Sequence, residues 1–217
     1  MKIYNFSIVG GHYVTTIKGQ QQFGFGHSGD GDFSDIKEII DREGYYKGMT
    51  IRFYNLETGE VYEPFQLNQN VTYGDVIFHD GLFYFLQADF NEKVVRLISF
   101  YPEKVKKVIT NLSMIDIQLN KLMLIGDSVN IVHHGDMFIS YYPEQFEIDI
   151  DVDDTVVMID ENKVYINQWI EEEEILEDGQ MHYNWYNKLL IKDFAGKLLS
   201  EEIGMLQQHN DGSWWLS

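Results

Sequence analysis

The chain has 217 residues, no cysteine, and 35 acidic against 16 basic residues, which gives a formal charge of −19. Disulfides, thiolate catalysis and cysteine-ligated zinc are therefore excluded, and such an acidic surface repels phosphate backbones and anionic membranes, so we expect neither nucleic-acid nor membrane binding. Hydrophobic residues make up 44% of the chain, enough for a sizeable core, but no segment reaches the roughly 20 apolar residues that cross a bilayer. We expect a single domain over residues 1–217, located in the cytoplasm.

Near the N-terminus, the stretch GFGHSG (residues 24–29) has the letters of a dinucleotide-binding loop. In that loop the glycines open a helix that holds the pyrophosphate, and a parallel strand follows. Here Asp30, Asp32 and Asp35 would set like charge against a phosphate, and the next element is an antiparallel hairpin. We expect no nucleotide, and no other cofactor is indicated.

A short helix is predicted at about residues 34–43, inside an insertion that spans about 19–48. Asp32 or Ser34 can cap its start and Gly44 can end it, and three isoleucines form its apolar face (Ile36, Ile39 and Ile40). The oxygen-bearing residues around it follow an EF-hand-like spacing, but the sixth position is Asp35 instead of glycine and no helix precedes them. Helix capping is therefore favoured over a bound metal ion.

From end to end, the rest of the sequence is dominated by β-hairpin signals, in which β-rich runs flank short turns. The turns are of two types that alternate along the chain, and the four turns of one type are about 44, 41 and 52 residues apart, the spacing of four-stranded propeller blades. They fall near Gly10-Gly11, Thr58-Gly59, Asp80-Gly81, Pro102-Glu103, Asp127-Ser128, Pro143-Glu144, Glu161-Asn162, Ala195-Gly196 and Asp211-Gly212.

The runs YNLETGEVYEPF, FYPEKV and YYPEQF resemble the outer hairpins of β-propeller blades. This generic resemblance, without a WD, kelch or lectin-repeat signature, implies an all-β, propeller-like array of four-stranded antiparallel blades. The blades would span about 1–66, 71–110, 119–151 and 154–202, followed by a two-strand remnant at 204–217, as in a five-bladed ring with an incomplete last blade. A β-sandwich built from the same hairpins is the alternative.

Two long insertions, 19–48 and 171–187, both connect the second and third strands of their blades. In a propeller such connections emerge from one face, and long loops on a rigid scaffold are where function usually sits. We therefore expect a non-catalytic binding module that uses this loop-bearing face, with a protein or a neutral carbohydrate as partner.

The expected binding residues lie in the two insertions and at one strand end. Tyr and Trp are enriched where partners or sugars dock, and histidines and carboxylates accompany them here. No metal is expected, because adjacent histidines on a strand point to opposite faces. The residues are His27, Asp30, Asp32, His133, Asp136, His182, Tyr183, Trp185 and Tyr186.

No catalytic residues are assigned, since the sequence has no GxSxG motif and no serine in a recognisable His/Asp order. Two alternatives stay open. One is a glycoside hydrolase-like enzyme with carboxylates at the ends of inner strands. The other is a structural assembly subunit that self-associates through an edge strand such as SWWLS. The carboxylates in question are Asp75, Asp153, Asp154 and Glu202.

Overall fold

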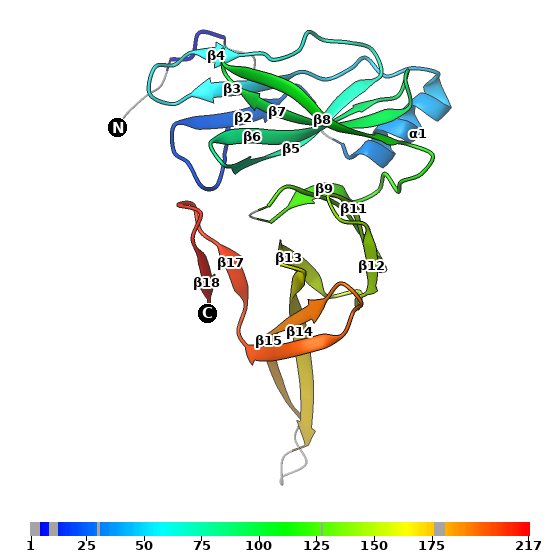
Figure 1. Ribbon diagram of the computed structural model, residues 1–217, viewed down its shortest axis with the longest axis vertical. Coiled ribbons are helices and arrows are strands. Elements are labelled where there is room, and N and C mark those ends of the chain that lie inside the picture. Colours follow the sequence, from blue (N-terminus) through cyan, green and yellow to red (C-terminus); the bar gives the residue numbers. More distant parts are fainter. Residues whose placement is uncertain (1–4, 9–12, 30, 127, 176–180) are drawn as a thin grey trace. The chain divides into compact units, whose positions relative to one another are not determined.

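The computed structural model (Figure 1) describes residues 5–8, 13–29, 31–126, 128–175 and 181–217. Its strands form four four-stranded sheets and one two-stranded hairpin, and within each of them the strands lie in chain order. The prediction of an all-β fold with four groups of four antiparallel strands is confirmed. The predicted hairpin turns from Thr58-Gly59 to Asp211-Gly212 are also found between paired strands. Gly10-Gly11 and Asp127 lie outside the described residues.

The chain divides into two compact units. The first contains residues 1–124 and 210–212, and the second contains residues 125–209 and 213–217. The first and second sheets and the helix belong to the first unit. The fourth sheet and most of the third belong to the second unit. The single domain over 1–217 stays a prediction.

The first sheet places its second strand inside the stretch that the sequence predicted to be loop. A loop was expected from residue 19, but Phe23–His27 pairs with strands on both sides, so the connection to the third strand spans only 28–50. A Cβ on Gly24 would lie 2.5 Å from Val14 Cγ1 and 2.9 Å from the Thr15 carbonyl oxygen, so this glycine permits close strand pairing. The strands are β1 (Thr15–Thr16), β2 (Phe23–His27), β3 (Ile51–Asn55) and β4 (Val61–Tyr62).

The connection 28–50 contains the one helix of the described residues, α1 (Phe33–Glu43), which confirms the predicted helix. It begins at the N-cap Asp32 and ends at Gly44, whose φ of 81° is in the left-handed region that favours glycine. Ile36 is fully buried, and Ile39 and Ile40 pack against the core beside it. The isoleucine face thus fixes the helix on the first unit.

The second sheet is a regular four-stranded meander closed by tight turns. Asp80 and Gly81 both have positive φ, 46° and 75°, as a two-residue hairpin turn requires for strands with right-handed twist. Pairing between its first two strands shifts between Tyr73 and Val76, which marks a β-bulge. The strands are β5 (Val71–His79), β6 (Leu82–Asp89), β7 (Val94–Tyr101) and β8 (Val105–Ser113).

Aromatic rings fill the core of the first unit. Phe53 of β3 and Phe83 and Phe85 of β6 are completely buried, and the Phe53 ring centroid lies 5.1 Å and 5.8 Å from the other two. Such rings bury large apolar areas and gain further from tilted contacts. The first two sheets and α1 therefore share one core.

The third and fourth sheets supply a second, aliphatic core. Val132, Val164 and Ile166 are fully buried there together with Phe138. His134 joins the two sheets, because its Nε2 accepts a hydrogen bond of 3.0 Å from the Val156 N–H. The strands are β9 (Leu122–Ile125), β10 (Asn130–His134), β11 (Met137–Tyr142), β12 (Phe146–Asp149), β13 (Thr155–Asp160), β14 (Lys163–Ile175), β15 (Met181–Asp193) and β16 (Leu198–Ile203).

The predicted two-strand remnant is confirmed as a hairpin of β17 (Leu206–Gln208) and β18 (Trp214–Leu216). One side chain of β14 links this hairpin to the fourth sheet. Asn167 Nδ2 donates to the Leu206 carbonyl at 2.8 Å, and Asn167 Oδ1 accepts from the Leu206 N–H at 2.9 Å. The amide thus replaces the pairing that a neighbouring strand would give.

Across the described part of the chain, no helix has the length and apolar character needed to span a membrane.

Replacing Asn167 with alanine removes both hydrogen bonds to Leu206. We therefore expect the free energy of local opening of the β17–β18 hairpin to fall by about 1–3 kcal/mol. Amide hydrogen exchange of residues 206–208 measures this. Asn184→Ala, at an exposed position, serves as the control. Equal protection in both variants would contradict the role of Asn167.

Candidate functional site

The nine expected binding residues fall into both units. His27 and Asp32 lie in the first unit, Asp30 lies outside the described residues, and the other six lie in the second unit. A common surface of the two insertions therefore stays a prediction.

Asp32 acts as the N-cap of α1. Its Oδ1 accepts hydrogen bonds from the backbone N–H groups of Ser34 (2.7 Å) and Asp35 (2.9 Å), and Asp35 Oδ2 accepts one from the Asp32 N–H in return. Partial burial raises the pKa of Asp32, but the hydrogen bonds from the Ser34 hydroxyl and from backbone N–H groups outweigh it, so the pKa is lowered overall. This carboxylate is a structural group of the helix terminus.

A hydrogen bond and an ion pair engage two further residues of the EF-hand-like spacing. Ser34 donates its hydroxyl to Asp32, and Asp41 is ion-paired with Lys37 one turn earlier. Among the residues that the structure describes, no three histidine or carboxylate side chains gather where they could hold a metal ion.

A cavity of about 490 Å³ opens beside the start of α1, and all of its lining residues belong to the first unit. His27, at the end of β2, and Asp32 both line it, so these two expected site residues share one cavity. Asp75 of β5, named only for the enzyme alternative, lines it as well. Instead of beginning an inner strand, Asp75 lies in the middle of β5.

The remaining carboxylates of the enzyme alternative do not share a site of that kind. Glu202 lies on β16, the outer strand of the fourth sheet, where it is exposed opposite Leu189. Asp154 is buried before β13, and its Oδ2 accepts from the Asp151 N–H at 3.1 Å. Glu202 therefore lies near the end of β16, before β17, and Asp154 immediately precedes β13, so the enzyme alternative stays a prediction for these two residues.

His133 and Asp136, expected together at a strand end, have different surroundings. His133 is only 3% exposed, and a Cβ on Gly135 would lie 2.3 Å from its Nε2, so the ring lies directly over that glycine. Asp136 is exposed in the turn between β10 and β11. Only the carboxylate is therefore accessible to a partner.

Residues 171–187, expected to be a long loop, are instead continuous strand on either side of residues 176–180. β14 and β15 pair from Lys163–Asp193 as far as Ile175–Met181. β13 pairs with β14 only as far as Asn167, and β16 pairs with β15 only from Lys188 onward. Beyond these points β14 and β15 form a two-stranded ribbon, which we call the arm (residues 168–175 and 181–187; Figure 1).

Strand alternation divides the aromatic residues of the arm between its two faces. Trp169, Tyr183 and Trp185 share one face, where they are 42%, 47% and 57% exposed. We call these three residues the aromatic face. Trp169 Nε1 donates to Glu171 Oε1 at 3.0 Å on the same side.

The other face carries His182 and Tyr186. The Tyr186 hydroxyl donates to Glu172 Oε1 at 2.9 Å, and this hydrogen bond to a carboxylate raises the pKa of Tyr186. The expected cluster of His182, Tyr183, Trp185 and Tyr186 is thus split in two. Sequence reasoning missed Trp169 as a site residue, because the run WIEEEE (residues 169–174) does not alternate between apolar and polar residues as a half-buried strand would.

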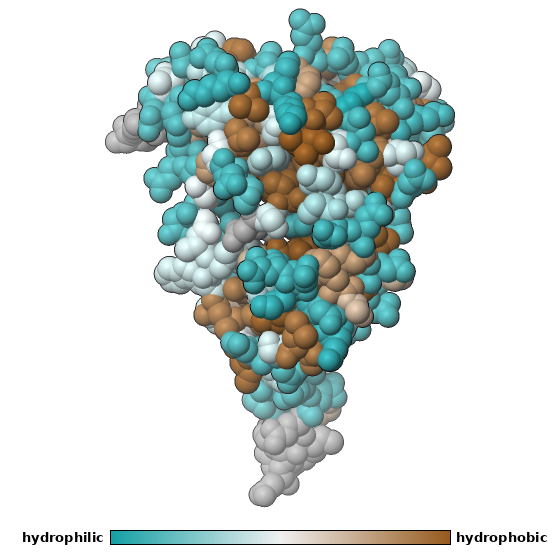
Figure 2. Space-filling view, in the orientation of Figure 1, coloured by the Kyte–Doolittle hydropathy of each residue, from teal (hydrophilic) through white to brown (hydrophobic). Residues whose placement is uncertain are grey.

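Negative charge is concentrated in the second unit. Its residue ranges contain 19 acidic and four basic residues, a formal charge of −15, whereas the first unit has 16 acidic and 12 basic residues, a charge of −4. Between residues 168 and 187 there are six acidic residues and no lysine or arginine. Figure 2 shows apolar side chains set among hydrophilic ones over the part of the surface in view.

No protein-family model matches this sequence, and no curated protein or solved structure is significantly similar to it.

Removing the cap should destabilise α1. Asp32→Ala is expected to cost about 1 kcal/mol of unfolding free energy, while Asp32→Asn keeps an acceptor oxygen and loses little. Because the pKa of Asp32 lies below its ordinary 3.8 in the folded protein, this stabilisation is present above that pH and is lost as the pH falls through the lowered pKa.

Urea unfolding at pH 7 and at about pH 3 measures both effects. If Asp32→Asn were as damaging as Asp32→Ala at pH 7, the negative charge and not the capping oxygen would be what the position requires.

Proposed function

We propose that the protein is a non-catalytic binding module whose second unit docks a protein partner through the aromatic face of the arm. The observation that supports this most is the exposure of Trp169, Tyr183 and Trp185 on a ribbon with no neighbouring strand in the described residues. Two-stranded ribbons are marginally stable in water by themselves, and a partner that covers one face would stabilise this one.

The size and rigidity of these side chains suit a binding surface. Tyr and Trp bury roughly 150–250 Å² each on contact, lose few rotatable bonds, and dominate the energetics of many interfaces. Cross-strand pairing of Glu171 with Trp185 and Glu173 with Tyr183 sets carboxylates beside the rings. The surface thus combines large apolar contacts with a charged rim.

The charge of the second unit selects the class of partner. A formal charge of −15, with no lysine or arginine in the arm, attracts basic surfaces and repels nucleic acids and anionic membranes. We therefore propose a partner segment rich in lysine and arginine. A neutral carbohydrate, which also stacks on Trp and Tyr, is the alternative ligand of the aromatic face. A cytoplasmic location of the protein stays part of the proposal.

The proposed architecture behind this function is a propeller-like array with an incomplete last blade. Four consecutive four-stranded meanders and a final hairpin support it. In such an array the connections between second and third strands would emerge on one face.

A random peptide library displayed on phage and panned against the immobilised protein tests the proposal without a known partner. We expect the recovered peptides to carry net positive charge, and their affinity to fall about tenfold or more in Trp185→Ala and Tyr183→Ala with unchanged melting temperature. Tyr186→Phe, on the opposite face, is the matched control and should bind as well as wild type.

Peptides without charge bias, or undiminished binding to Trp185→Ala, would contradict a basic partner on this face. Binding of neutral oligosaccharides that depends on Trp185, with no peptide recovered, would assign the same residues to the carbohydrate alternative.

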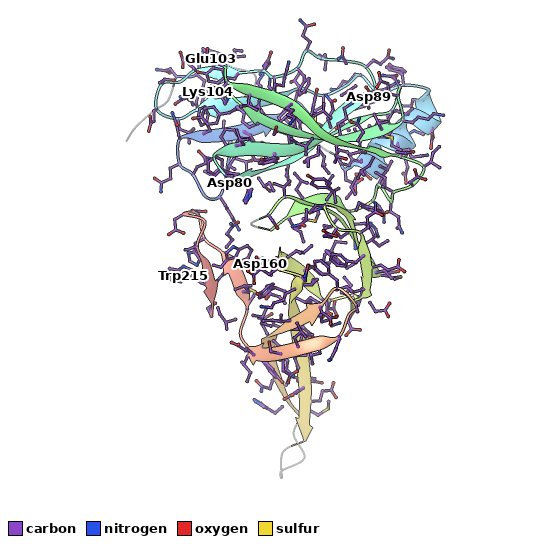
Figure 3. All side chains as sticks on the ribbon, in the orientation of Figure 1. Asp80, Asp89, Glu103, Lys104, Asp160 and Trp215 are labelled. Atoms are coloured by element: carbon purple, nitrogen blue, oxygen red, sulfur yellow. The ribbon has the colours of Figure 1, made fainter. Side chains whose placement is uncertain are left out.

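A second candidate function, self-association, is favoured by the last hairpin. β18 pairs with β17 alone among the described strands, and Trp215 of β18 (Figure 3) is exposed. Its ring centroid lies 4.1 Å from that of His209. Unpaired strand edges recruit further strands. Light scattering should then show a dimer that Trp215→Lys dissociates, whereas a strict monomer at high concentration would remove this candidate.

A further inference from the structure

The cavity of the first unit is independent of the arm and has the features of a ligand site. Its volume of about 490 Å³ falls within the range of small-molecule pockets. Apolar side chains supply much of its wall, among them Phe33, Met49, Ile77 and Leu86. A few polar groups complete it, as is usual where a ligand is oriented as well as enclosed.

A β-bulge places Asp75 at this cavity. Tyr73 pairs with Gln87 and Val76 with Phe85, so Gly74 and Asp75 of β5 together face the single residue between them on β6. Bulges bend a strand and redirect one side chain, and they recur next to binding sites. Asp75 is exposed and makes no hydrogen bond or ion pair with any residue in the described ranges.

The bulge is built into the packing around it. A Cβ on Gly74 would lie 3.3 Å from Phe33 Cζ, at the first residue of α1, so the glycine lets the helix start lie directly against the strand. On the preceding residue, the Tyr73 hydroxyl accepts from Gln87 Nε2 at 3.3 Å, and Gln87 Oε1 accepts from Arg96 Nη1 at 3.0 Å. The two residues that precede Asp75 are therefore held in place by packing and by hydrogen bonds.

The electrostatic character of the cavity is negative. Its lining includes the carboxylates of Asp32 and Asp75 and no lysine or arginine. Arg96, the nearest cation of the supporting network, is neutralised by Asp89 at 3.1 Å (Figure 3). Burial raises the pKa of Tyr73, against a lowering by its hydrogen bond from Gln87, so that side chain stays a neutral phenol.

The arrangement fits an organic cation better than a metal ion. His27, Asp32 and Asp75 line one cavity, yet in the described residues no three such groups gather closely enough to bind a metal. An organic molecule several atoms long can extend through the cavity, with an ammonium group at one end and apolar atoms at the other. Aromatic walls add to the binding of such a cation.

We propose that this cavity binds a small organic ammonium ion, with the Asp75 carboxylate as its ion-pair partner. The hydrocarbon part of the ligand lies against Phe33, Met49 and Leu86, and Asp32 adds negative potential while it caps α1. Because the cavity and the arm lie in different units, this site neither needs nor supports the proposed partner docking.

Isothermal titration calorimetry of the full chain tests this site with benzylammonium, cyclohexylammonium and tetramethylammonium chlorides. We expect at least one of them to bind at millimolar concentration or below, and benzyl alcohol, the neutral analogue, to bind at least about tenfold more weakly than benzylammonium. Asp75→Asn should weaken ammonium binding by about tenfold or more.

Asp80→Asn is the matched control, because it removes the same charge from the exposed β5–β6 turn outside the cavity (Figure 3). Its affinity should equal that of wild type, and both variants should unfold at the wild-type temperature. The proposal is overturned if none of the three ammonium ions binds, if benzyl alcohol binds equally well, or if Asp75→Asn binds like Asp80→Asn.

Discussion

Pairing between β14 and β15 continues past the ends of both neighbouring strands, and the proposed function depends on this one feature. Inside the fourth sheet, alternation sends every second side chain of β14 into the core, as with the fully buried Val164 and Ile166. Trp169 and Trp185 lie on the opposite face of the ribbon from Val164 and Ile166, and beyond Asn167 no further described strand pairs with β14 or β15, so both rings remain on the surface. A surface of this kind is costly to maintain in water, which argues that it is retained for contact with another molecule.

The two units differ in how they combine charge and packing. The first unit has an aromatic core around Phe53, a nearly balanced surface and a cavity, whereas the second has a smaller aliphatic core and carries most of the negative charge. Self-repulsion among its carboxylates opposes folding of the second unit. A basic partner would relieve that repulsion, so the charge and the aromatic face favour the same kind of complex.

The hairpins can be predicted from the sequence because certain turn residues indicate the backbone angles that a tight turn requires. Asp80-Gly81 and Glu161-Asn162 have the positive φ angles that such dipeptides accept, and the four-strand groups follow from the turns. The same reasoning fails for β2, because its glycines are typical of a loop. It also fails for the arm, because four consecutive glutamates in β14 break the alternation of apolar and polar residues that predicts a strand. The cavity is beyond sequence reasoning, because a bulge at Gly74 and Asp75 is defined only by the register of two strands.

The central claim is that the arm is an incomplete ribbon that a basic partner covers. Amide hydrogen exchange along β14 and β15, with and without a lysine-rich peptide recovered on the protein, tests it most directly. The account predicts that in the free protein residues 168–175 exchange faster than residues 163–167, and that the peptide slows exchange in the arm while the first unit is unchanged. Slow exchange of the arm in the free protein, or peptide-induced protection confined to other strands, would contradict it.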